Sequence, residues 1–228
     1  EMAAGLSLGE YGALAAAGVM ELPDLFRIIR MRGIYMQEAY PEGGAMTAVL
    51  GLDGDAVAAI CEQTAKETGK VVSVANYNCP GQIVISGKTE AVAEAGEKLK
   101  EAGAKRVLPL KVSGPFHSKM LVGAGEKLGK VLDTVEIHTP EIPYIANVTA
   151  DYVTDAADVK PLLMKQVSSS VRWEQTIRKM LADGVDTFIE IGPGKTLTGF
   201  MRKIDKNAKA FNIEKLEDID KVKEALGC

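Results

Sequence analysis

Residues 45–112 carry an order of strand and helix patterns that few folds can satisfy. Short apolar, β-branched runs alternate with two amphipathic stretches, and a Cys79-Pro80-Gly81 turn separates the two middle strands. The expected strands are Ala45–Leu52, Val71–Asn78, Gln82–Ser86 and Arg106–Val112, and the expected helices are Asp55–Gly69 and Lys88–Ala102. The order β-α-β-β-α-β over about 70 residues is that of a ferredoxin-like unit. Pro109 inside the last strand predicts an edge position or a bulge, because proline cannot donate to a central ladder.

The segments on either side of this unit predict a second domain of the α/β class. Pro41-Glu42-Gly43-Gly44 ends the first segment, and Ser113–Ser118 returns the chain to it. Helices and strands alternate outside the insert, which predicts a mostly parallel sheet. The expected helices are Tyr11–Gly18, Leu25–Tyr40, Lys119–Thr134, Asp155–Val167, Trp173–Asp183, Leu197–Lys206 and Asp218–Leu226, and the expected strands are Ile142–Asn147, Thr187–Ile191 and Phe211–Ile213. We therefore expect a large domain at 1–43 and 114–228 and a small domain at 44–113.

Composition and charge exclude several classes of function. The 228 residues are 46% hydrophobic and 25% charged, as in ordinary globular proteins, and the net charge of −4 gives no electrostatic case for nucleic-acid binding. No apolar run approaches membrane-spanning length and no signal peptide opens the chain, so we expect no membrane association. Cys61, Cys79 and Cys228 are too widely spaced to suggest a metal site, and we interpret them as reduced thiols in a cytoplasmic protein.

Gly5-Leu6-Ser7-Leu8-Gly9 at the start of the chain reads G-x-S-x-G and precedes a run of helix formers. In a nucleophile elbow such a serine sits on a sharp strand-to-helix turn, and the two glycines relieve steric crowding. The N–H of Leu8 would lie at a helix N-terminus, where it can stabilise an oxyanion. The alternative is an accidental match, since the chain contains 23 glycines. An elbow also needs a hydrophobic strand in front of it, and only residues 1–4 precede the motif.

Only two histidines are available as a base for Ser7. His117 follows a predicted strand in a Gly-Pro turn, where α/β proteins place catalytic groups, although a plain surface-loop histidine fits as well. His138 lies in a connector without a motif and is the weaker candidate. No acidic residue suggests itself as a third member, but a backbone carbonyl can also hold one tautomer of the base.

Two further motifs have both a functional and a structural interpretation. Arg32 lies on the first long helix after the elbow, as either a guanidinium clamp for a substrate carboxylate or a surface arginine. Gly192-Pro193-Gly194 follows a predicted strand and precedes a helix, so it is either a phosphate-binding turn or, more simply, a structural one.

Taken together, these segments resemble one family, the malonyl-CoA:acyl-carrier-protein transacylases of type II fatty acid synthesis. The matching segments are GLSLGEYGALAAAGV, IRMRGIYMQEA, VANYNCPGQIVISG, AKRVLPLKVSGPFHSKM, KQVSSSVRW and IEIGPGKTLTGF. They follow the family's order and cover essentially the whole chain. The resemblance implies an α/β-hydrolase-like domain carrying an inserted ferredoxin-like domain, in agreement with the patterns above.

The resemblance also implies roles for the catalytic residues. Ser7 would be the nucleophile and His117 its base, with the main-chain carbonyl of Gln166 orienting the imidazole. The amide of Leu8 would form half of the oxyanion hole. The reaction implied is malonyl transfer from malonyl-CoA to the phosphopantetheine thiol of acyl carrier protein, through a malonyl-serine intermediate and without a cofactor or metal. We expect a monomeric enzyme.

The substrate-binding residues follow from the same resemblance. Arg32 would bind the malonyl carboxylate, and Asn78 and Gln82 align with a polar loop of the small domain that faces the cleft. Phe116, just before the histidine, resembles the residue of malonyl-selective members, whereas methylmalonyl-selective members usually have a small residue there.

The chain departs from the family at two points. Leu6 stands where the family has histidine in the elbow, and the family's N-terminal segment, with its first strand and Gly-Gln-Gly motif, has no counterpart among the 228 residues. Its absence would expose sheet edges and apolar surface, so we expect these residues alone to be impaired. Two alternatives therefore stay open: a serine hydrolase or thioesterase that releases acyl groups to water, and a catalytically impaired fragment that binds coenzyme A or the carrier.

Overall fold

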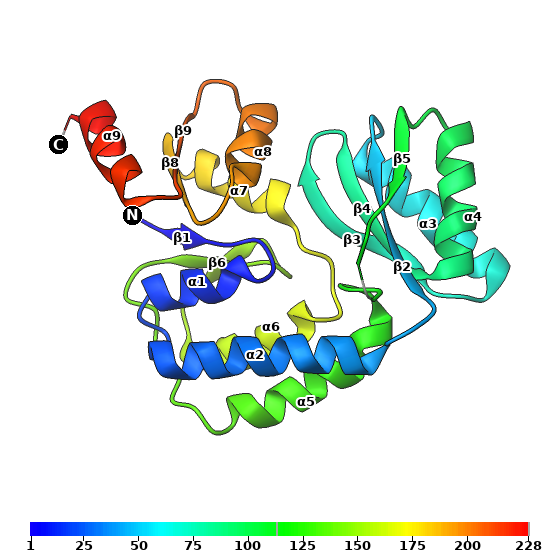
Figure 1. Ribbon diagram of the computed structural model, residues 1–228, viewed down its shortest axis with the longest axis horizontal. Coiled ribbons are helices and arrows are strands. Elements are labelled where there is room, and N and C mark those ends of the chain that lie inside the picture. The colour runs from blue at the N-terminus through cyan, green and yellow to red at the C-terminus, as the bar shows by residue number, and fades with distance from the viewer. Residues whose placement is uncertain (113, 228) are drawn as a thin grey trace. The chain divides into compact units, whose positions relative to one another are not determined.

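The computed structural model describes residues 1–112 and 114–227, which form two compact units, 1–176 and 177–228 (Figure 1). Ser113, at the predicted domain boundary, and Cys228 lie outside the described residues. The domain limits predicted above, with a small domain at 44–113, stay a prediction. None of the helices in the described part of the chain is long and apolar enough to cross a membrane.

The middle of the first unit forms the predicted ferredoxin-like sheet. Its elements are β2 (Gly44–Leu50), α3 (Gly54–Thr68), β3 (Val72–Cys79), β4 (Gln82–Lys88), α4 (Thr89–Glu101) and β5 (Arg106–Pro109). The strand order is β3-β4-β2-β5, and every neighbouring pair is antiparallel. Pro109 ends β5 at the edge of the sheet, so the edge position predicted from this proline is confirmed.

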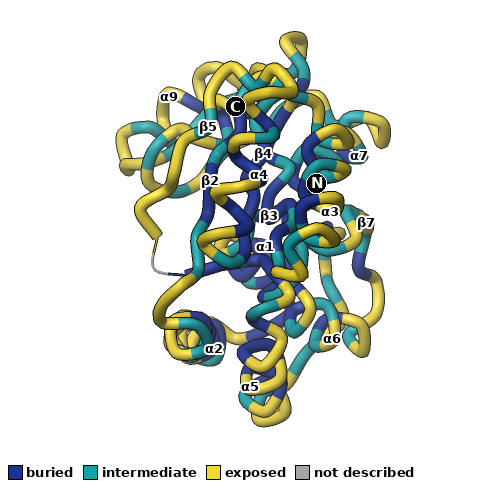
Figure 2. The backbone as a smooth tube through the Cα atoms, turned by 90° about the vertical axis from the view of Figure 1, so that its right-hand side faces the viewer, coloured by how far each residue is buried: buried dark blue, intermediate teal, exposed yellow. Residues whose placement is uncertain are grey.

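The two strands β3 and β4 of this sheet bury residues on both of their faces, as their dark tube shows in Figure 2. Alternate residues point to opposite faces because the side-chain period of a strand is two. Ile83 and Ile85 of β4 join the core beneath α3 and α4, whereas Val84 between them packs with Met46 and Phe116 on the other face. That second face becomes one wall of the cavity described below.

A second sheet and four helices of 8 to 18 residues form most of the remainder of the first unit. The strands are β1 (Ala3–Ala4), β6 (Tyr144–Ala146) and β7 (Asp151–Val153), in the order β1-β6-β7. The helices are α1 (Gly9–Ala16), α2 (Leu22–Ala39), α5 (Val122–Leu132), which follows the short helical turn η1 (Lys119–Leu121), and α6 (Ala156–Gln166). β1 pairs with β6 in parallel and β6 with β7 antiparallel, and the three-residue β7 was not predicted from the sequence.

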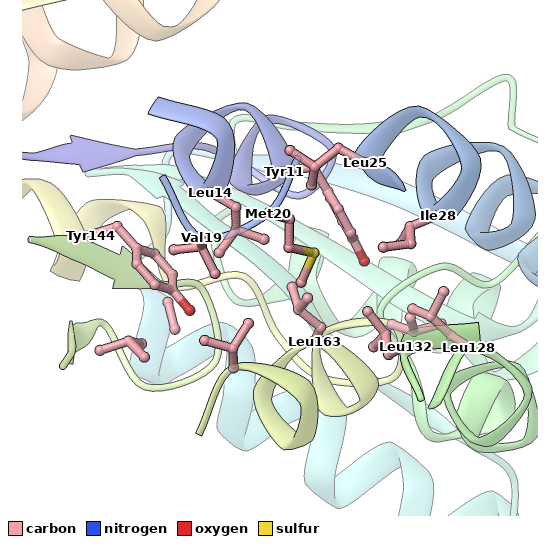
Figure 3. Close-up of a cluster of buried hydrophobic side chains, with 14 of the residues drawn as sticks. Tyr11, Leu14, Val19, Met20, Leu25, Ile28, Leu128, Leu132, Tyr144 and Leu163 are labelled. Carbon is pink, nitrogen blue, oxygen red and sulfur yellow. The ribbon is translucent and has the colours of Figure 1, made fainter. Parts of the chain in front are cut away.

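One apolar core joins these elements (Figure 3). Tyr11 and Leu14 from α1, Ile28 from α2 and Leu163 from α6 are completely buried in it. Removing side chains of this size from water supplies the main driving force for folding. The core therefore connects the helix after Ser7 to the helix that ends at Gln166.

The second unit is small and contains a parallel two-stranded sheet. It contains most of α7 (Trp173–Ala182), then β8 (Thr187–Ile191), α8 (Thr196–Ile204), β9 (Lys209–Ile213) and α9 (Leu216–Leu226), and β8 pairs with β9 in parallel. Gly192 and Gly194 have φ values of 140° and 84°, which side-chain-bearing residues rarely adopt. The backbone conformation of Gly192-Pro193-Gly194 therefore explains why glycine occupies both positions, without a ligand.

Two glycines of α5 provide a matched test of helix packing. A Cβ on Gly125 would lie 2.4 Å from the carbonyl oxygen of Met164 in α6, whereas one on the exposed Gly123 would have no heavy atom within 4 Å. Gly125→Ala should lower the free energy of unfolding by about 1–3 kcal/mol through overpacking. Gly123→Ala should raise it by about 0.5–1 kcal/mol through helix propensity. Urea unfolding of both variants checks this, and equal effects would contradict the close packing of α5 on α6.

Candidate active site

Ser7 lies on a tight turn between β1 and α1. Its φ of 52° is in the left-handed region, which costs a residue other than glycine free energy that the surroundings must supply. A Cβ on Gly5 would lie 1.9 Å from the carbonyl oxygen of Gly9, so position 5 has space only for glycine. A Cβ on Gly9 would meet nothing within 4 Å. The prediction that both glycines relieve crowding is therefore correct for Gly5 and wrong for Gly9.

Two side chains from distant elements bind the backbone of Ser7. Asn147, directly after β6, accepts a hydrogen bond from the Ser7 N–H through Oδ1 at 2.6 Å. The Nδ2 of Asn147 also donates to the Gly5 carbonyl at 2.7 Å. From the end of α6, Gln166 donates from Nε2 to the Ser7 carbonyl at 2.9 Å. Asn147 is not among the residues predicted from the sequence, although a polar residue at the carboxyl end of a strand is a usable signal.

His117 lies against the hydroxyl of Ser7, with its Nε2 2.7 Å from the serine Oγ. The other ring nitrogen, Nδ1, is 2.9 Å from the main-chain carbonyl of Gln166. A carbonyl only accepts, so Nδ1 carries the proton and Nε2 presents a lone pair to the serine. The structure thus brings Ser7, His117 and the Gln166 carbonyl together in a hydrogen-bonded chain. His138, in contrast, is exposed and lies 3.8 Å from Glu136.

The surroundings of His117 keep its imidazole neutral. Burial lowers its pKa from 6.5 to about 4, and the positive charge of Arg32 acts in the same direction, against the opposing effect of the Gln166 carbonyl. Near pH 7 the ring is therefore an unprotonated base with its accepting nitrogen on Ser7.

Arg32, a buried residue of α2, also contacts the hydroxyl of Ser7. Its Nη2 donates to the serine Oγ at 2.9 Å and to Gln166 Oε1 at 3.0 Å, and its Nε donates to the same oxygen at 3.2 Å. The guanidinium also lies 5.5 Å from the centre of the Tyr11 ring. No carboxylate in residues 1–112 or 114–227 comes within salt-bridge distance of it. A buried cation with no carboxylate in salt-bridge contact, next to a serine hydroxyl, favours a ligand that carries a negative charge.

A cavity of about 380 Å³ opens over these groups. One wall contains Ser7, Arg32 and His117, and the rest is mainly apolar and comes from both parts of the first unit. The other lining residues are Gly33, Met36, Met46, Asn76, Val84, Leu110, Val112 and Phe116. Its size is that of a small ligand pocket.

The small-domain residues expected in this cavity differ from those that line it. Phe116 lines it as predicted, but Asn78 and Gln82 are not among the lining residues, and Asn76 is. Asn78 is buried in β3, and Gln82 starts β4, with its Oε1 4.0 Å from the Sγ of Cys79. The ladder of β3 is irregular between Val74 and Asn76 and again before Cys79. This irregularity places Asn76 at the cavity, and strand alternation alone does not predict it.

The other predicted positions are located as follows. Leu8 leads into α1 at its N-terminal end, and its side chain is largely exposed. Leu6 is partly buried, and its carbonyl accepts the N–H of Gly9 at 2.9 Å. Among the described residues, no three His, Cys, Asp or Glu side chains form a group that could hold a metal ion. A serine with a neutral histidine base, at the N-terminal end of a helix on an α/β scaffold, is typical of acyl-transferring enzymes.

Comparison with known proteins supports this class. Residues 1–220 match the acyl transferase domain family. The malonyl CoA-acyl carrier protein transacylase of Bacillus subtilis (strain 168) is 48% identical over 221 residues, which cover 96% of this chain and 69% of that protein. The crystal structure of an acyl-carrier-protein S-malonyltransferase from Bartonella henselae superposes with a TM-score of 0.94 at 44% identity, covering 100% of this chain and 72% of that chain.

A third match is a malonyl-transacylase solved in complex with its type II PKS acyl-carrier protein. It has a TM-score of 0.94 at 40% identity and covers 98% of this chain and 72% of that chain. The chain belongs to the family of malonyl CoA-acyl carrier protein transacylases, which are acyltransferases. The predicted fold class, an α/β-hydrolase-like domain with an inserted ferredoxin-like domain, is thereby confirmed.

The state of His117 predicts the pH dependence of Ser7 reactivity. The neutral imidazole is the reactive form of the base. The second-order rate constant for Ser7 labelling by a fluorophosphonate should therefore stay constant as the pH falls from 8, and it should drop to half of this plateau near the histidine pKa of about 4. A stopped-assay pH series measures this, with His138→Gln as the control that leaves the profile unchanged. A midpoint near the ordinary histidine value of 6.5 would contradict the assigned environment.

Proposed function

We propose that this protein transfers the malonyl group of malonyl-CoA to the phosphopantetheine thiol of acyl carrier protein, in fatty acid biosynthesis. One observation carries the proposal: the Oγ of Ser7 lies 2.7 Å from the His117 Nε2 and 2.9 Å from the Arg32 Nη2. The imidazole base and the guanidinium cation therefore both lie within hydrogen-bond distance of the same hydroxyl. Relatives named for this activity support the substrate assignment.

In the first half-reaction His117 removes the proton of the Ser7 hydroxyl as the Oγ attacks the thioester carbonyl carbon. The N–H of Leu8, at the start of α1, stabilises the oxyanion. The intermediate collapses by breaking its C–S bond, and His117 returns the proton to the departing thiolate of coenzyme A. Ser7 then carries the malonyl group as an ester.

The second half-reaction runs the same steps with the carrier. His117 takes the proton of the phosphopantetheine thiol, the sulfur attacks the ester carbonyl, and the Ser7 Oγ leaves with that proton. A C–S bond forms and the ester C–O bond breaks, which is the reverse of the first half-reaction. The enzyme therefore returns to its starting state. Thioester and ester exchange needs only a nucleophile and a proton carrier, so the proposed reaction uses no cofactor.

Arg32 gives the site its preference for malonyl over acetyl groups. A malonyl group carries a free carboxylate, which can accept two parallel hydrogen bonds from a guanidinium, whereas an acetyl group has none. Burial increases the strength of this pairing because the surroundings screen charge less than water does. The apolar lining, with Phe116 beside His117, would hold the methylene carbon.

The proposal also covers the compartment and the oligomeric state of the enzyme. Cys61 is a buried free thiol, which fits a protein that works in the reducing cytoplasm. We propose that it acts as a monomer.

Malonylation of Ser7 is the direct test of the proposed intermediate. Incubation with malonyl-CoA, without carrier, should add one malonyl group to the peptide that contains Ser7, and Ser7→Ala should abolish the adduct. Mass spectrometry of the digested protein measures it. Addition of acyl carrier protein should discharge the adduct to the carrier thiol. Steady release of free malonate at an equal rate without carrier would instead identify a hydrolase.

The role of Arg32 predicts a loss that depends on the acyl group. Arg32→Ala should lower kcat/KM for malonyl transfer by about 100-fold or more, as expected when a charge-assisted pair is lost. Transfer of acetyl should fall far less. Arg30→Ala, an exposed arginine on the same helix, is the matched control and should change neither rate. Equal losses for malonyl and acetyl would exclude the carboxylate clamp.

A further inference from the structure

Glu10 is a buried carboxyl group that the mechanism above does not use. It lies in the first turn of α1, its side chain is fully buried, and it does not line the cavity. It can therefore reach neither the substrate nor solvent. Burying a carboxyl group is costly unless its hydrogen bonds are made, so its contacts indicate what it does there.

One oxygen of Glu10 joins two distant segments. Its Oε2 accepts a hydrogen bond from the Nε2 of Gln166 at 2.7 Å and another from the main-chain N–H of Asn147 at 3.2 Å. The other oxygen, Oε1, has no hydrogen-bond partner in the described part of the chain. Glu10 thus ties the end of α6 to the loop after β6 through a single atom.

The two partners of Glu10 are the same residues that bind the backbone of Ser7. The side chain of Asn147 accepts a hydrogen bond from the Ser7 N–H, and the side chain of Gln166 donates one to the Ser7 carbonyl. Ser7 has a φ of 52°, so its conformation persists only because its neighbours hold it. A group that fixes both neighbours also fixes the direction of the serine hydroxyl.

Glu10 also determines which way the Gln166 amide faces. The amide Oε1 accepts from two donors of Arg32, while its NH2 faces two acceptors, Glu10 and the Ser7 carbonyl. Without the acceptor at position 10, the buried Nε2 loses one of its two partners. The amide is then held less firmly in the orientation that keeps Arg32 Nη2 on the serine Oγ.

We propose that Glu10 is a positioning residue for acyl transfer, which aligns Ser7 by holding Gln166 and Asn147 on its two backbone groups. The proposal rests on Ser7 being the nucleophile of the proposed function. Glu10 acts through these two side chains and touches neither the substrate nor the reacting atoms.

The property required of residue 10 is a hydrogen-bond acceptor and not a charge. Burial raises the pKa of Glu10 to about 7, against the hydrogen bonds from Gln166 and Asn147 and the charge of Arg32. A carboxyl oxygen that accepts is present in both protonation states. A glutamine at this position keeps such an oxygen with nearly the same shape, so Glu10→Gln should preserve the alignment that Glu10→Met removes.

The test measures Ser7 reactivity with a fluorophosphonate, which needs neither malonyl-CoA nor the carrier. The serine Oγ forms a bond to phosphorus, fluoride leaves, and His117 receives the proton. Glu10→Met should lower the maximal inactivation rate by about 10- to 100-fold with little change in the half-saturating probe concentration, since misplacement of a reacting group acts on the chemical step. Glu10→Gln should remain within about threefold of the wild type.

Glu190→Gln is the matched control, because Glu190 accepts hydrogen bonds from the backbone of Leu197 and Thr198 far along the chain from Ser7. It should leave the inactivation rate unchanged. Thermal melting shows that each variant is folded. If Glu10→Met does not melt cooperatively, Glu10→Asp takes its place with the same expected loss, because its carboxyl group is one methylene shorter and is withdrawn from Gln166 and Asn147. A wild-type rate in the folded Met or Asp variant would overturn the proposal, as would an equal loss in Glu10→Gln. Failure of malonyl transfer would not affect this readout.

Discussion

The structure of this site depends on holding Ser7 in the left-handed backbone conformation. A φ of 52° on a residue with a Cβ costs about 1–3 kcal/mol and would relax without support. The support comes from Asn147 on one backbone group and Gln166 on the other, with Gly5 allowing the turn to close against Gly9. The strained turn directs the hydroxyl at His117 and Arg32, whereas Asn147 and Gln166, which hold the turn, are not among the residues that line the cavity.

The buried ionisable groups around Ser7 have opposite effects on stability as the pH changes. The pKa of His117 is lower in the folded state, so its contribution to the free energy of unfolding decreases as the pH falls from about 6.5 towards about 4. The pKa of Glu10 is raised, so its contribution decreases as the pH rises from about 4.5 towards about 7. Arg32 remains charged between them, which leaves one fixed cation available for an anionic substrate.

The inserted sheet contributes to the site through its second face. Its first face packs on α3 and α4, as in any isolated ferredoxin-like unit, and the second carries Met46, Asn76 and Val84 into the cavity wall. A sheet buried on both faces has apolar residues at successive positions, as the run from Ile83 to Ile85 shows. The insert thus forms part of the cavity wall as well as a packed unit in its own right.

The sequence by itself determined the element order and the ferredoxin-like unit, and it singled out Ser7, His117 and Arg32, which the structure brings into hydrogen-bond contact. Periodicity, glycine and proline positions and short motifs are local signals, and nearly every predicted helix and strand is present within a few residues of its expected place. Only the tertiary structure decided how Ser7 is held. Asn147 and Gln166 lie 140 and 159 residues from it in the chain, and the strand irregularity that brings Asn76 to the cavity depends on pairing with β4. Glu10 stands three residues from Ser7, yet its role depends on the folding of β6 and α6 against α1, which no local pattern encodes.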